Sequence, residues 1–356
     1  MNRTRYVPEV CVWEITLRCN MRCLHCGSSA GKARPNELTV EECLRVADEL
    51  IELGCRQVTL IGGEVFLYRG WEQVAARLSA AGALVNIITN GHLLGHAQIE
   101  QIRRANLVNV GISIDGMEES HDRTRNVPGA FRDALEAMDR LRREQIPRGV
   151  VTCLLDYSFS DLERLYEVLV EYGVTVWQIQ IATPMGNLAG DEGMLLDPAK
   201  VPLLTRFIRE KREEQHIRIY AGDDVGYYDK HELYLRNHPG SICAWRGCQA
   251  GLTVVGIDSV GNVKGCESLY SDRFIEGNLR EQSLADIWHQ DGAFAYNRQF
   301  DVAQLSGRCA GCDKGSVCRG GCRGTCYFTT GSLYENVYCC YPGQPAHGTP
   351  GLAEAR

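Results

Sequence analysis

The sequence has no apolar run long enough to cross a membrane, no export signal and no excess of positive charge. A membrane-spanning helix needs roughly 18 or more consecutive apolar residues, and no run approaches that length. The chain reaches a charged, cysteine-bearing segment too soon to contain the apolar region of a signal peptide. A net charge of −7 leaves no electrostatic footprint for nucleic acid. We therefore expect a cytoplasmic protein that acts on a peptide or small molecule, without a membrane or nucleic-acid partner.

Cysteine, in contrast, is abundant. The chain has 17 cysteines among its 356 residues. A disulfide framework needs an oxidising compartment and usually a short chain. The cysteines are therefore interpreted mainly as metal ligands.

Short apolar runs rich in branched residues alternate with amphipathic stretches from Val10 to about Lys211. This alternation is typical of βα units on a parallel sheet. The expected strands are 11–16, 57–62, 84–89, 109–114, 149–155 and 176–181. A helix is expected from Val40 to Ile51, with Thr39 as its cap and Gly54 as its stop signal. The later helices are expected at 71–81, 96–104, 130–144, 161–172 and 198–214.

The βα rhythm ends near residue 220. The segment 221–242 is polar, aromatic and bounded by Gly and Pro, which indicates a bridge between domains. Beyond it Gly and Cys dominate, so folding is expected to depend on bound metal. The expected organisation is a first domain at 1–220, the bridge, a cysteine-rich domain at 243–340 and a tail at 341–356 of disordered composition.

Three closely spaced cysteines follow the first expected strand. Cys19, Cys23 and Cys26 form C-x3-C-x2-C. Such a loop can wrap three thiolates around a cubane of four irons and leave one iron without a protein ligand. Zinc is the alternative. It generally takes a fourth nearby Cys or His, and the one nearby candidate, His25, sits between two of the candidate cysteine ligands.

The segment EITLRCNMRCLHC (14–26) resembles the opening motif of radical S-adenosylmethionine (SAM) enzymes. The resemblance covers most of the chain and implies an α/β fold, a partial (β/α)6 TIM-like barrel followed by a small cysteine-rich iron–sulfur domain. It also implies that the open iron of a 4Fe-4S cluster is chelated by the methionine moiety of SAM. Electron transfer then cleaves the cofactor to a 5′-deoxyadenosyl radical. His25 matches the position whose backbone usually contacts the adenine.

Further matches to the family occur at the carboxyl ends of later strands, where barrel enzymes keep their chemistry. Gly62, Gly63 and Glu64 match the motif that meets the methionine amino group, although Val65 replaces the usual proline. Asn90, Ser113 and Asp115 match positions where family members bind the ribose or the carboxylate.

The C-terminal cysteines resemble the SPASM extension of the same family, although Cys309-x2-Cys312 alone would also suit a zinc ribbon. The resemblance implies two auxiliary 4Fe-4S clusters. The ligands of the nearer cluster would be Cys248, Cys266 and Cys322, with either Cys243 or an open iron as the fourth position. The ligands of the outer cluster would be Cys309, Cys312, Cys318 and either Cys339 or Cys340. Cys339 is preferred because NVYC (336–339) resembles the family's closing turn.

Other cysteines have no partners in spacing. Cys11, Cys43, Cys55 and Cys153 fall on expected strands or helices and are interpreted as buried small apolar residues. Cys326 has no assigned role.

The H-D-x-x-R sequence of His121, Asp122 and Arg125 resembles a segment common in SPASM enzymes that modify ribosomally made peptides. It is expected on the loop after Asp115. The alternative is a capping and salt-bridge network at a helix start. No residue is assigned a catalytic role.

The resemblance implies a maturase that abstracts hydrogen from a precursor peptide through a 5′-deoxyadenosyl radical, giving a cross-link, an epimer or an excision. The alternatives are an anaerobic sulfatase-type protein maturase and a dehydrogenase or tetrapyrrole-modifying enzyme. The implied cofactors are SAM and three 4Fe-4S clusters, one SAM-binding and two auxiliary. The implied partners are the precursor peptide and a flavodoxin- or ferredoxin-type electron donor. Because only 18 residues precede Cys19, peptide recognition is expected to be direct or supplied by a separate protein.

Overall fold

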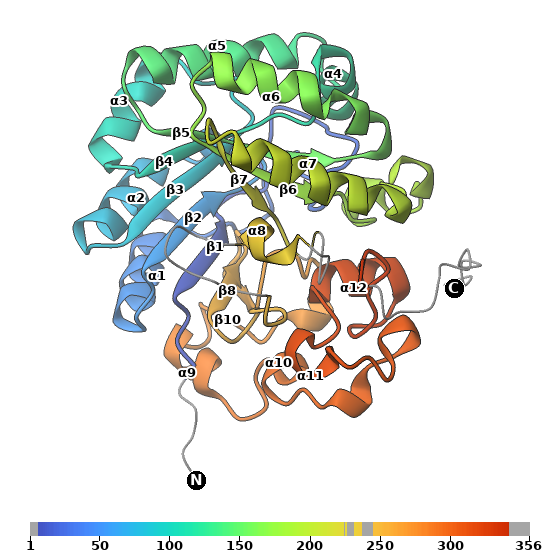
Figure 1. The fold of residues 1–356 in the computed structure, drawn as a ribbon. Coiled ribbons are helices and arrows are strands. Elements are labelled where there is room, and N and C mark those ends of the chain that lie inside the picture. The colour runs from blue at the N-terminus through green and yellow to red at the C-terminus, as the bar shows by residue number, and fades with distance from the viewer. Residues whose placement is uncertain (1–5, 224, 226–230, 237–244, 342–356) are drawn as a thin grey trace.

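One continuous sheet organises the chain. A computed structural model describes residues 6–223, 225, 231–236 and 245–341 (Figure 1). The ten described strands follow the order β10-β9-β8-β1-β2-β3-β4-β5-β6-β7. Their bounds are β1 Val10–Glu14, β2 Gln57–Ile61, β3 Leu84–Thr89, β4 Asn109–Ser113, β5 Arg148–Leu154, β6 Val176–Ile181, β7 Arg218–Ala221, β8 Val254–Ile257, β9 Asn262–Lys264 and β10 Gly277–Asn278.

The six expected βα units are confirmed. Strands β1 to β7 are all parallel, and Figure 1 shows the helices between them on the outer side of the sheet. The helices are α1 Val40–Glu52, α2 Trp71–Ala80, α3 His96–Ala105, α4 Glu118–Arg125, α5 Ala130–Arg143, α6 Leu162–Glu171 and α7 Val201–Glu213. Strand β7 was not predicted, because its four residues contain too little alternation to distinguish them from a loop. Strand β7 runs across residue 220, where the first domain was expected to end. That domain boundary stays a prediction.

Helix α1 shows how local sequence sets an element. The Thr39 hydroxyl oxygen accepts a hydrogen bond from the Glu42 amide, and the Glu42 carboxylate accepts one from the Thr39 amide. This capping box satisfies two otherwise unpaired amides. The helix ends at Glu52, and Gly54 follows its C-cap with a φ of +98°, which suits glycine best. The predicted cap and stop are both confirmed.

The main core lies between the sheet and the surrounding helices. Trp13, Leu60, Ile87 and Val110 are register partners on successive strands, and each side chain is fully buried. Burying one such side chain contributes about 1.5–3 kcal/mol. Because side chains alternate across a strand, the residues between them, such as Glu14, face inside the curved sheet.

The cysteine-rich segment extends the barrel sheet. Strand β8 pairs in parallel with β1, with Val12 opposite Gly256, and β9 and β10 continue antiparallel. At Gly256 a Cβ would lie 2.6 Å from the Glu267 amide nitrogen, so glycine permits this close approach. Pairing with β8 also covers an edge of β1 that would otherwise be open.

The rest of this segment contains short helices: α8 Glu232–Arg236, α9 Leu284–His289, α10 Ala295–Arg298, α11 Gly315–Cys318 and α12 Arg323–Thr330. Trp288 and Phe294 are fully buried in the main core. This part of the segment therefore contributes large apolar side chains to the main core, which its Gly- and Cys-rich composition did not indicate.

Two expectations lie outside the described residues: the disordered character of the tail from residue 342 onward, and the role of Cys243. Within the described part of the chain, no helix combines the length and apolar character that crossing a membrane requires.

Candidate active site

The loop after β1 brings Cys19, Cys23 and Cys26 together: besides burial, the nearby thiols of Cys23 and Cys26 raise the pKa of Cys19, and the thiol of Cys26 raises that of Cys23. The Met21 amide donates to Cys19 Sγ at 3.4 Å, and the Ala30 amide donates to Cys26 Sγ at 3.3 Å. Amides directed at sulfur are a common surrounding of iron–sulfur clusters.

Neighbouring elements hold this loop in place. The Leu24 amide donates to the Thr124 carbonyl of α4 at 2.8 Å. The side chain of Asn187, beyond β6, donates to the Cys23 carbonyl at 2.9 Å. The loop is therefore anchored to both sides of the barrel mouth.

The three thiols fit a cluster with one open iron. Burial raises the pKa of Cys19 to about 11 and also raises that of Cys23, so bound metal would have to displace their protons. The Nε2 atom of His25 is directed at the Asp115 network, 3.6 Å from Asp115 Oδ2. Across the residues that the structure describes, no group of three or more His, Cys, Asp or Glu is arranged to hold a single metal ion. Three thiols on one loop are the donor set that a cluster with one open iron takes.

Glu64 is a buried carboxylate beside this loop, with 1 % of its surface exposed. It accepts hydrogen bonds from the Asn90 amide at 2.9 Å, from Thr89 Oγ1 at 2.9 Å and from the Phe66 amide at 3.3 Å. Burial nevertheless raises the pKa of the carboxyl. No ion pair to Glu64 exists among the described residues, so an ammonium group is a suitable ligand for it.

Gly62 and Gly63 pack directly on the cluster loop. A Cβ would lie 2.6 Å from the Thr16 carbonyl oxygen at Gly62 and 2.4 Å from the Arg18 carbonyl oxygen at Gly63. Only glycine allows this approach. Asn90 also joins the loop, because its side-chain amide donates to Asn20 Oδ1 at 2.7 Å. The predicted positions 62, 63, 64 and 90 therefore meet around the predicted cluster.

Asp115 is the centre of a buried polar network. Arg125 Nε lies 2.7 Å from Asp115 Oδ2, the Cys153 amide donates to Oδ1 at 3.1 Å, and the Asp115 amide donates to His121 Nδ1 at 3.0 Å. Burial opposes ionisation of Asp115, but Arg125 and the two histidines outweigh it, and its pKa is lowered. Burial lowers the pKa of His25 and of His121 to about 4, so both rings are neutral near pH 7.

Arg125 connects this network to the cluster loop, because its Nη1 lies 3.8 Å from Cys23 Sγ. Ser113 ends β4 on the face that it shares with Asp115. In this structure Asp115 therefore contacts only side chains and amides of the protein itself among the described residues. Arg125 places a positive charge beside Cys23, a predicted cluster ligand.

The H-D-x-x-R segment was expected on a loop, but it forms helix α4. The capping interpretation is confirmed for Asp122, whose carboxylate accepts from the Gly129 amide at 2.5 Å and from the Phe131 amide at 2.8 Å. His121 and Arg125 belong instead to the Asp115 network. Sequence spacing missed this because the partners come from separate elements.

Sequence reasoning also missed a set of charged residues on the inner face of β1, β8 and β9. Arg34 Nη1 lies 2.5 Å from both Glu14 Oε1 and Ser259 Oγ, and its other terminal nitrogen contacts the Tyr270 hydroxyl. The Tyr270 hydroxyl donates to the Ser28 carbonyl at 3.3 Å. This chain of contacts connects the first cysteine loop with the segment after Cys266.

A second ion pair lies on the same face. Lys264 Nζ is 3.1 Å from Glu267 Oε2, and both side chains are buried. Burial raises the pKa of Glu267 to about 7. The available signal was a charged residue within an apolar strand, as in Glu14 and Lys264, which is unusual on a buried face.

The nearer auxiliary group brings Cys248, Cys266 and Cys322 together. A hydrogen bond with Cys322 lowers the pKa of Cys248 to about 5. Burial, with a smaller effect from Cys248, raises the pKa of Cys266 to about 12. Asp223 Oδ1 lies 4.0 Å from Cys322 Sγ, which gives this group an acidic neighbour that sequence spacing did not indicate.

The outer group contains the other predicted ligands. Burial raises the pKa of Cys309, and the nearby thiols of Cys318 and Cys312 raise it further. Burial likewise raises the pKa of Cys339 to about 12, and the thiols of Cys309 and Cys318 contribute to that rise. The structure therefore places Cys339 within the group.

The remaining cysteines differ in their surroundings. Cys11, Cys43 and Cys55 are buried, as predicted, whereas Cys153 is only partly buried. Cys153 deviates because its strand end borders the Asp115 network. Cys326 is buried and donates to the Gly320 carbonyl at 3.0 Å.

These contacts gather the first cysteine group and the predicted cofactor-binding residues at the carboxyl ends of parallel strands, where barrel enzymes keep their chemistry. The family model of the radical SAM superfamily matches residues 13–169. A second model, of the SPASM iron–sulfur cluster-binding domain, matches residues 248–313. The chain belongs to the radical SAM superfamily and is an enzyme with a SPASM domain, and these domains imply SAM and 4Fe-4S clusters as its cofactors.

Two kinds of relative match nearly the whole chain. An AdoMet-dependent heme synthase of Methanosarcina barkeri is 30% identical over 350 residues, covering 95% of this chain and 98% of the relative. A mycofactocin maturase, MftC, of Mycobacterium ulcerans is 29% identical over 354 residues, covering 98% of this chain and 91% of the relative.

A solved structure supports the fold. Streptococcus suis SuiB bound to S-adenosylmethionine has a TM-score of 0.76 at 16% identity, covering 93% of this chain and 76% of SuiB. At that identity the similarity shows the fold alone.

Proposed function

We propose that the chain is a maturase that uses the radical SAM reaction to remove a hydrogen atom from a residue of a precursor peptide. The observation that carries this proposal is the MftC similarity, which extends over both the barrel and the SPASM segment. The open sheet is compatible with it. Among the described strands, β7 and β10 are the two edges, so the barrel is not closed around its inner face and an extended segment can approach from the side.

The residues of the site are assigned roles on this basis. Bound SAM and its cluster would supply an organic radical that abstracts hydrogen. Glu64 is proposed to receive the methionine ammonium, and Gly62 and Gly63 to let the cofactor approach their backbone. The Asp115 network is proposed to fix the ring of His25. Ser113 and Asn90 are proposed to complete the cofactor site.

The three cysteine groups are proposed to hold three 4Fe-4S clusters. Cys19, Cys23 and Cys26 would hold the SAM-binding cluster. The two groups of the SPASM segment would hold the auxiliary clusters, with Cys243 as the fourth ligand of the nearer one and Cys339 as the last ligand of the outer one. The buried Lys264–Glu267 pair lies next to Cys266, where it can contact a substrate placed between the barrel and the nearer auxiliary group.

A second candidate is the oxidation of a tetrapyrrole. It is favoured by the heme synthase similarity, which covers 98% of that relative. The substrate would again have to reach the inner face of the sheet.

Parallel reactions with the two candidate substrates distinguish the two proposed functions. Anaerobically reconstituted enzyme is incubated with SAM, a reductant and either the short peptide encoded nearest to this chain or an iron coproporphyrin. Mass spectrometry then follows both substrates. A loss of two hydrogens, an epimer labelled with deuterium or an excised fragment supports the peptide proposal. Conversion of the porphyrin with an unchanged peptide overturns it in favour of the second candidate. The Glu64→Gln variant serves as the control for cofactor-independent changes.

A further inference from the structure

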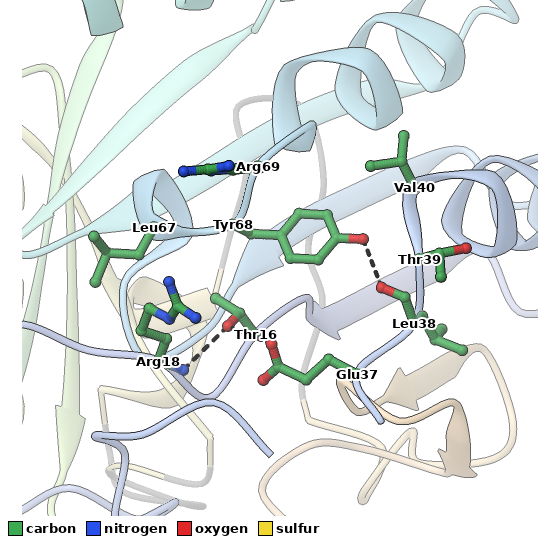
Figure 2. A pocket seen from close by; sticks show the side chains of 9 residues that line it. All are labelled: Thr16, Arg18, Glu37, Leu38, Thr39, Val40, Leu67, Tyr68 and Arg69. Carbon is green, nitrogen blue, oxygen red and sulfur yellow. Dashed lines mark hydrogen bonds between the residues drawn. The ribbon is translucent and has the colours of Figure 1, made fainter. Parts of the chain in front are cut away.

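Two exposed arginines line one hollow at the rim of the barrel (Figure 2). The hollow has a volume of about 470 Å³ and is formed by the loop after β1, the residues that lead into α1 and the segment after Glu64. Arg18 comes from the first of these segments and Arg69 from the last. Neither guanidinium forms an ion pair with any residue that the structure describes, so both charges are available to a partner.

The lining contains one acidic residue, Glu37, against these two arginines. Glu37 uses its carboxylate inside the protein, where it accepts from Thr16 Oγ1 at 2.9 Å and from the Leu17 amide at 2.7 Å. The Tyr68 hydroxyl donates to the Leu38 carbonyl at 2.7 Å, a contact drawn in Figure 2. These hydrogen bonds fix the lining of the hollow, which carries two arginine charges against the one carboxylate of Glu37.

The hollow shares its backbone with the active site. Arg18 directly precedes Cys19, and the Arg18 carbonyl accepts from the Glu64 amide at 2.8 Å. Cys19 is itself partly exposed. A protein seated on this rim would approach the first cysteine group from outside, without occupying the inner face of the sheet where the substrate must bind.

Cofactor cleavage in this superfamily requires one electron from outside the chain. We propose that the hollow between Arg18 and Arg69 is the docking surface for an acidic one-electron donor protein that carries a flavin or an iron–sulfur cluster. The donor is oxidised by one electron and the first cluster is reduced by one, with no bond made or broken. Because the chain as a whole carries a net charge of −7, an acidic partner is repelled by most of its surface and attracted to this patch.

The test compares a protein donor with a small one. In the Arg18→Glu/Arg69→Glu variant, reduction of the first cluster by reduced flavodoxin should slow by about tenfold or more at low salt, since charge reversal acts mainly on the association rate. Reduced methyl viologen, a small radical cation that needs no docking surface, gives one electron and becomes the dication. Its rate of cluster reduction should stay within about twofold of wild type. Electron paramagnetic resonance of the reduced cluster gives both rates, and iron analysis confirms equal loading.

Arg164→Glu/Arg206→Glu is the matched control. Both residues are exposed on α6 and α7, at the far end of the sheet from β1, and the change in charge is identical. If this control slows flavodoxin as much, the effect is one of net charge and the docking surface is refuted. Equal flavodoxin rates in the rim variant and wild type also refute it. The readout is cluster reduction, so neither result depends on the substrate proposed above.

Discussion

Glu64 is the residue whose surroundings most directly indicate a ligand, because its buried carboxylate accepts from three neutral donors and forms no ion pair among the described residues. Glu64→Gln keeps its size and removes its charge. A hydrogen bond to a charged group contributes about 1.5–3 kcal/mol, so SAM affinity should fall roughly ten- to a hundredfold. Calorimetry of the anaerobic enzyme measures this fall.

The clusters should remain in that variant, since Glu64 is outside the three cysteine groups. Glu171→Gln, at an exposed residue of α6, is the control and should bind SAM as the wild type does. Wild-type affinity in Glu64→Gln would remove this residue from the cofactor site.

The buried pair of Asp115 and Arg125 makes a second prediction at this scale. Removing one partner leaves the other charge buried and alone, which costs about 3–5 kcal/mol. Asp115→Asn and Arg125→Met should therefore each lower the free energy of unfolding, whereas the double variant should lower it by much less than the sum. Denaturant unfolding of the four proteins measures the coupling. Strict additivity would mean that the 2.7 Å contact contributes little.

Among the elements, the closing turn of the SPASM segment separates two adjacent cysteines. Cys339 is buried and is affected by Cys309 and Cys318, while Cys340 is partly exposed and its Sγ donates to the Tyr338 carbonyl at 3.7 Å. Cys339→Ser should therefore lose one cluster, about four irons, and much of the soluble yield, because metal affinity there is folding energy. Cys340→Ser should keep both. Iron analysis of the two variants shows which cysteine is the ligand. A greater loss of iron in Cys340→Ser than in Cys339→Ser would assign the ligand to Cys340.

The contrast between helices α1 and α4 shows which elements a sequence predicts well. The cap and stop of α1 depend on residues within its own ends, Thr39, Glu42 and Gly54, so local pattern is sufficient. Helix α4 has few apolar residues, and its buried members are His121, Thr124 and Arg125. A periodicity search overlooks such a helix because polar contacts, not apolar ones, hold it in place.

For the whole molecule, three cysteine groups predict three clusters. The reconstituted protein should contain about 12 Fe and 12 sulfide per chain, and a Cys19/Cys23/Cys26→Ala variant should retain about eight of each. Iron, sulfide and absorption measurements under anaerobic conditions test this count. Stoichiometric zinc with little iron would contradict it, and a wild-type content near eight would leave one group empty.

The sequence by itself determined the six βα units and the cap and stop of α1, because these depend on short-range periodicity and on residues at the ends of one element. The cysteine groups were implied by the family resemblance of their spacing, and their ligand sets stay predictions. The resemblance to the family motif also pointed to Glu64, beside Gly62 and Gly63. Only the tertiary structure decided that β8 pairs with β1, that Arg34 joins Glu14 to Tyr270, and that Arg125 reaches Cys23. These contacts join residues separated by as many as 244 positions, as in the pairing of Val10 with Val254. No local pattern specifies such a pairing, since it arises only when folding brings distant polar groups into a shared interior where each must find a partner.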